Sequence, residues 1–145
     1  MPIAFPVIVS VYGKVVVAPL ESLGILMDLR GDHRIFCCQS FRKPESRALK
    51  WLVEYSGAYR SLRFITYHHK WLQPLRYLWN FVREEYEVGS PEVITVGRLR
   101  QLLRESTVSK YEDEPVAPWL IMRLQELQFS DDDIVTEELL RRVNI

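Results

Sequence analysis

Aromatic and basic residues alternate closely between Lys50 and Tyr86. Bases of single-stranded nucleic acid stack on aromatic rings at about 1–3 kcal/mol each, and Lys and Arg side chains neutralise phosphates with release of counterions. The combination predicts a sequence-tolerant, salt-sensitive surface that binds RNA, with an anionic membrane as a close competitor. The residues that we expect to bind are Arg60, Arg63, Lys70, Arg76, Tyr77, Phe81 and Arg83.

The alternative is that most of these rings belong to the core. A helix from Pro74 to about Tyr86 would have one apolar face that is wide enough to bury. That face consists of Leu75, Leu78, Trp79, Val82 and Tyr86. Tyr77 and Phe81 fall on the opposite side of this helix, so we expect a second layer to cover them or an interface to form there.

The residue types that bind metals do not form a preformed site. They are His33, Cys37, Cys38, His68 and His69. Along a strand His33 and Cys37 would lie about 13 Å apart, and adjacent residues point to opposite faces. No helix N-terminus or flanking motif marks either thiol as an activated nucleophile. We therefore predict no metal or other cofactor, and we interpret both cysteines as small buried residues on a strand.

Carboxylates cluster only in polar runs, at 84–87, 112–114 and 131–133. Carboxylates in solvated runs make poor general acids. Glycine-rich phosphate loops and the hydrolase motifs GxSxG and HExxH are absent from the sequence. We predict a protein that is not an enzyme.

Charge is divided along the chain. Met1 to Arg83 carries twelve Lys and Arg against five Asp and Glu, while Glu84 to Ile145 carries seven against fourteen. The zero net charge is therefore +7 cancelled by −7. Complementary parts of this kind can bind head to tail, which generates rings or filaments that weaken with salt. We expect the acidic part to dock on the basic surface of the same molecule or of another copy.

The composition is that of one folded domain. A chain of 145 residues with 48% hydrophobic residues is long enough for one core and too short for two. Its two cysteines are adjacent, which favours a reducing, intracellular compartment such as the cytoplasm or nucleus. The apolar N-terminus lacks the basic start of a signal peptide, and no stretch approaches the roughly 18 apolar residues of a membrane span.

Strands are expected mainly in the N-terminal part. Val7 to Val17 holds two β-branched runs joined near Tyr12-Gly13, which predicts a tight hairpin. Ile25 to Leu29 and Arg34 to Cys38 predict a second strand pair, although residues 21–29 could also form a short helix. The aromatic and β-branched content of Leu62 to His69 favours another strand.

Helices are expected from Pro44 onward. Leu49, Leu52 and Val53 form an apolar stripe that predicts a helix ending at Gly57. After the helix at Pro74, three more are predicted at Val96 to Glu105, Pro118 to Gln128 and Asp131 to Val143. The last has Ser130 as its N-cap, an acidic first turn and a basic last turn. The predicted fold is α+β, with N-terminal antiparallel β-hairpins followed by a mostly helical C-terminal half.

Three segments organise this single domain. They are a basic α+β body at residues 1–104, an acidic proline-containing linker at 105–118, and acidic helices at 119–145 that pack on the body. We predict a non-enzymatic, self-associating protein whose basic, aromatic-rich surface binds RNA or an anionic surface. The chain also has the general character of small viral accessory or matrix-like proteins.

The alternative function is that of an adaptor. Its C-terminal amphipathic helices would bind another protein through Leu120, Leu124 and Leu127. The same leucines could instead pack in the protein's own core.

Overall fold

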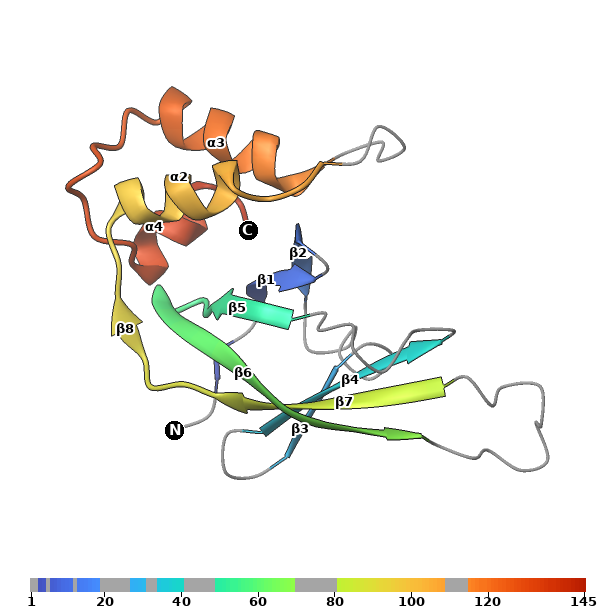
Figure 1. The fold of residues 1–145 in the computed structure, drawn as a ribbon. Coiled ribbons are helices and arrows are strands. Elements are labelled where there is room, and N and C mark those ends of the chain that lie inside the picture. The colour runs from blue at the N-terminus through green and yellow to red at the C-terminus, as the bar shows by residue number, and fades with distance from the viewer. Residues whose placement is uncertain are drawn as a thin grey trace.

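A computed structural model of the chain describes residues 3–4, 6–11, 13–18, 27–30, 34–40, 49–69, 81–108 and 115–145. These residues form an antiparallel sheet with helices grouped over one part of it, which confirms the α+β class (Figure 1). The strands are β1 (Val7–Val11), β2 (Lys14–Ala18), β3 (Met27–Arg30), β4 (Arg34–Ser40), β5 (Leu49–Val53), β6 (Ala58–His69), β7 (Phe81–Val88) and β8 (Glu92–Val93). The helices are α2 (Val96–Arg104), α3 (Val116–Glu126) and α4 (Glu137–Arg142).

Both predicted N-terminal strand pairs are present. In the first hairpin β1 pairs with β2 up to Val11 and Lys14, which leaves a two-residue turn. Gly13 in this turn has a φ of 79°, a conformation that glycine adopts without steric cost. In the second pair β3 lies beside β4, so the alternative helix at 21–29 is wrong for the part that falls in β3.

The helix predicted to end at Gly57 is a strand where the structure describes it. β5 lies between β1 and β6 in the sheet, whose order is β2-β1-β5-β6-β7-β4-β3. Trp51 and Val53 pack with the helices, while Leu49 and Leu52 pack on the other face. A register shift between β1 and β5 lets these two leucines, three residues apart, reach one cluster. Because both faces of β5 are buried, its apolar residues have a spacing that resembles the apolar stripe of a helix.

The helix predicted from Pro74 is also a strand where it is described, because β7 begins at Phe81 and lies between β6 and β4. Tyr86 is buried as predicted, but as part of a central strand. Its hydroxyl donates to the Glu84 carboxylate and accepts a hydrogen bond from the Leu49 amide at 3.1 Å. Its ring meets Phe64 edge to face, with 5.7 Å between centroids. The C-terminal half is thus not mostly helical.

The long strand β6 joins the two parts of the sheet and confirms the strand predicted from Leu62 to His69. Its first residues pair with β5, and from Leu62 onward it pairs with β7. After β7 the chain turns at Gly89, whose amide donates to the Ser61 carbonyl at 2.8 Å, and continues along β6 as β8. β6 and β7 extend away from the helices (Figure 1).

The helices pack against β1, β2 and β5 in one apolar cluster. From the helices this cluster includes Val96, Leu99, Leu102, Leu103, Ala117, Leu120, Leu124, Leu139 and Leu140, and from the sheet Ile8, Val15, Trp51 and Val53. α2 and α3 lie where they were predicted, although α3 begins at Val116, inside the predicted linker. None of the helices that the structure describes is long and apolar enough to cross a membrane.

The C-terminal helix begins later than predicted, at Glu137 instead of Asp131. The carbonyls of Asp133 and Asp131 accept the Val96 and Gly97 amides of α2 at 2.7 and 3.0 Å. The aspartate run is therefore a turn that satisfies the free amides of another helix. Thr136, not Ser130, caps α4 by accepting the Leu139 amide at 3.2 Å.

Candidate functional site

The structure places the predicted binding residue Arg60 in the interior, not on a surface. Its side chain is 5% exposed, and its Nε donates to Glu54 Oε2 at 2.5 Å. Its Nη1 donates to the Gly89 carbonyl at 3.1 Å, and the other oxygen of Glu54 accepts the Ala4 amide at 3.0 Å. Arg60 thus connects its own strand with Glu54 and Gly89 and is not available to a phosphate. The prediction that Arg60 binds a ligand at the surface is therefore corrected.

Arg63 is the predicted cation that the structure shows at the surface. It lies on β6 with its side chain 77% exposed, and it pairs with Glu87 directly across on β7. An exposed pair of this kind is held weakly, because water screens the attraction and ordering the side chains is unfavourable. The pair with Glu87 therefore leaves the Arg63 guanidinium accessible to solvent.

The other predicted binding residues are placed only in part. Phe81 and Arg83 lie in β7, with Phe81 opposite Ser40 and Arg83 opposite both Cys38 and His68. Their side chains, like the whole of Lys70, Arg76 and Tyr77, lie outside the described residues. All three of the latter fall in residues 70–80, which we call the basic connection because it joins β6 to β7.

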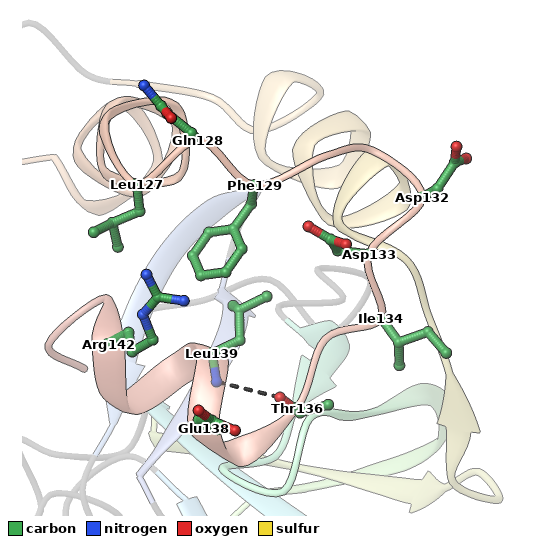
Figure 2. A pocket seen from close by; sticks show the side chains of 10 residues that line it. All are labelled: Leu127, Gln128, Phe129, Asp132, Asp133, Ile134, Thr136, Glu138, Leu139 and Arg142. Atoms are coloured by element: carbon green, nitrogen blue, oxygen red, sulfur yellow. Dashed lines mark hydrogen bonds between the residues drawn. The ribbon is translucent and has the colours of Figure 1, made fainter.

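A groove between the end of α3, the following loop and α4 has a volume of about 660 Å³. This size is typical of binding sites for small ligands or a few side chains. Figure 2 shows Phe129 and Leu139 near its middle, Ile134 at one side and Arg142 beside Phe129. Its lining residues are Leu127, Gln128, Phe129, Asp132, Asp133, Ile134, Thr136, Glu138, Leu139 and Arg142.

Local structure sets the shape of this C-terminal groove. Gln128 lies just after the end of α3 and has a φ of 59°. The Phe129 amide donates back to the Leu124 carbonyl at 3.2 Å, so the chain turns away from the helix here. The aspartate turn is then fixed on α2, where the Asp131 carboxylate pairs with Arg100. Because both ends of the loop are fixed, Phe129 and Ile134 keep their places in the lining of the groove.

The lining combines apolar side chains with an excess of negative charge, three carboxylates against one guanidinium. The Asp133 carboxylate accepts the Ser130 amide at 2.8 Å, and Arg142 lies 5.0 Å from the centre of the Phe129 ring. Asp132 and Glu138 are exposed, and neither forms an ion pair with another described residue. Such a groove suits a ligand that is both cationic and apolar, and it repels phosphate.

Helix α4 is also held to the sheet through the turn between β5 and β6. Arg141 is exposed, and a hydrogen bond with the Tyr55 hydroxyl together with the Glu137 carboxylate raises the pKa of its guanidinium above the usual value. Gly57 in the same turn has a φ of 94°, and a Cβ atom there would lie 2.2 Å from the Val135 carbonyl oxygen. The loop that forms one wall of the groove therefore rests directly on the sheet.

The leucines of the predicted adaptor lie mostly in the core. Leu120 and Leu124 are each 1% exposed and contact the sheet cluster, so a partner cannot reach them while α3 is packed. Leu127 is partly buried and lines the groove. Sequence reasoning missed the groove because it assigned residues 131–143 to one helix. A signal was present in Phe129 and Ile134, two apolar residues that flank a run of charges.

Among the residues whose side chains are described, no three His, Cys, Asp or Glu residues are grouped so as to hold a metal ion. Comparisons of the chain with protein-family models, curated proteins and solved structures returned no significant match.

Proposed function

We propose that this protein is a non-enzymatic binding and assembly protein, which self-associates head to tail and binds single-stranded RNA through its basic connection. The observation that carries the proposal is the division of charge along the chain, between a basic part that ends at Arg83 and an acidic part that begins at Glu84. The acidic loop and α4 lie at one side of the molecule, while the ends of β6 and β7 that flank the basic connection lie at the other (Figure 1). A molecule with these two parts can bind a second copy head to tail.

The basic connection has the composition that RNA binding requires. It contains Lys70 and Arg76, three aromatic rings and no carboxylate, and Arg83 follows it in β7. Arg63 adds an accessible cation on the neighbouring strand. Rings that stack on bases and cations that neutralise phosphates together give binding with little sequence preference.

RNA binding is tested by fluorescence anisotropy of a labelled single-stranded oligonucleotide. Four phosphate contacts, one for each of these cations, predict roughly 50-fold weaker binding at about 200 mM than at about 50 mM salt. The variant Lys70→Glu/Arg76→Glu should lose most of the affinity. Arg98→Glu/Arg104→Glu makes the same charge change on exposed residues of α2 and should lose much less.

Equal losses in the two variants would contradict the assignment to the basic connection. Absence of binding at low salt would exclude RNA as the ligand, and the same proteins would then be sedimented with vesicles that contain phosphatidylserine. Binding to those vesicles that depends on Lys70 and Arg76 would identify an anionic membrane instead.

A further inference from the structure

We infer that the C-terminal groove is the acceptor site for the basic connection of a second copy of the chain. The inference rests on the self-association in the proposed function and assigns it to particular residues. The groove has Phe129 and Leu139 near its middle and Ile134 at one side, and its lining is acidic overall. It is therefore suited to a segment that offers apolar rings and positive charge together.

The chain itself contains one matching segment. Residues 70–80 read Lys-Trp-Leu-Gln-Pro-Leu-Arg-Tyr-Leu-Trp-Asn, with two cations, three aromatic rings, three leucines and no carboxylate. A groove of about 660 Å³ accommodates only a few side chains. We assign its apolar centre to a tryptophan of the segment, Trp71 or Trp79, and its acidic rim to the neighbouring Lys70 or Arg76. An aromatic anchor in an apolar pocket, surrounded by charge pairs, is the usual arrangement of strong contact points.

We assign the segment to a second copy and not to the same molecule, because of where the flanking strands end. β6 ends at His69 and β7 begins at Phe81, and these strand ends lie on the side of the molecule away from α4 and its loop (Figure 1). The two strand ends that flank the segment thus lie away from the groove of the same molecule. The contact is therefore heterologous and leaves one free groove and one free segment, which allows rings or longer chains to form.

The accessible side chains at the groove make the contact testable. Ile134 is 54% exposed, and Asp132 and Glu138 are exposed carboxylates with no ion pair to another described residue. Asp132 points outward at the rim (Figure 2). Changes at these three positions alter the groove without removing a buried contact.

The experiment is an exchange of charge between groove and segment, followed by sedimentation velocity at low salt. The groove variant Asp132→Lys/Glu138→Lys and the segment variant Lys70→Glu/Arg76→Glu should each associate at least about tenfold more weakly than the wild type. When the two variants are mixed, opposite charges face each other again, and association should return. Ile134→Gln leaves the charge unchanged and should also weaken association. Glu92→Lys/Glu105→Lys, on exposed carboxylates outside the groove, is the matched control and should associate like the wild type.

The outcomes separate this inference from the function on which it rests. A wild-type protein that stays monomeric at low salt and high concentration would overturn both the groove assignment and the proposed self-association. Wild-type association that the groove variants do not weaken, or a mixture in which association fails to return, would overturn the groove assignment alone. Circular dichroism of each variant confirms that it is folded, and anisotropy should show that the groove variant still binds RNA.

Discussion

At the scale of single residues, two arginines three positions apart on one strand have opposite environments. Arg60 is enclosed with Glu54, while Arg63 is exposed and paired with Glu87. Removing one partner of a buried ion pair leaves an uncompensated charge in the interior, whereas an exposed pair contributes little. The two residues therefore differ in what they do for stability, although they look alike in the sequence.

We expect Arg60→Ala to lower the free energy of unfolding by about 3–5 kcal/mol, because Glu54 would remain buried without its cation. Arg63→Ala should lower it by less than about 1 kcal/mol. Urea denaturation followed by circular dichroism measures both. Replacing the pair together, as Glu54→Leu/Arg60→Met, should recover much of the loss. Similar small effects of Arg60→Ala and Arg63→Ala would show that Arg60 is not buried.

At the scale of elements, the residues around the aspartate run have the pattern of a helix N-terminus, but in the structure they contact a different helix. Ser130 followed by three aspartates matches a helix N-terminus, but the carbonyls of Asp131 and Asp133 bind the first amides of α2. Continuing α4 backward through this turn would leave those amides without partners. The chain instead begins α4 at Thr136, where a second capping residue is present.

Substitution of Thr136 and of Ser130 distinguishes a helix that begins after Thr136 from one that begins after Ser130. Thr136→Ala should destabilise the protein by about 1 kcal/mol, because the Leu139 amide loses its acceptor. Ser130→Ala should have a smaller effect, since the Ser130 hydroxyl accepts only the exposed Asp132 amide at 3.3 Å. Thermal denaturation measures the difference. A larger effect of Ser130→Ala would indicate that the helix begins where the sequence pattern predicts it.

At the scale of the whole molecule, the C-terminal segment has two properties. It carries an excess of negative charge, and it also contributes to the core. α3 contributes Leu120 and Leu124, and α4 contributes Leu139 and Leu140, to the cluster that covers the sheet. A buried leucine contributes about 1.5–3 kcal/mol, so four of them represent roughly 6–12 kcal/mol. The total stability of a domain is typically about 5–15 kcal/mol.

We therefore expect truncation before Pro115 to abolish cooperative unfolding, and not simply to remove an acidic mask. A melt followed by circular dichroism should show no transition for the truncated chain. Asp132→Asn/Glu138→Gln neutralises charge while keeping the helices, so it should melt close to the wild type. A truncated chain with a sharp transition would show that residues 1–114 form an independent domain.

Several elements could be predicted because their signals are local. The β1–β2 hairpin follows from two β-branched runs around a glycine turn, and α2 and α3 follow from apolar residues at helical spacing. β5 and β7 could not be predicted in this way. Leu49, Leu52 and Val53 fit a helix as well as a strand, and only pairing with β1 and β6 decides between them.

The amino-acid sequence alone determined the α+β class, the first hairpins, the division of charge and the basic, aromatic composition of residues 70–80. These properties depend on residue type and on neighbours along the chain. Tertiary structure decided that Arg60 is internal, that carbonyls of the aspartate run accept the first amides of α2, and that Phe129, Ile134 and Leu139 line one groove. Each of these depends on contacts between segments far apart in sequence, and local periodicity contains no information about which segments will meet.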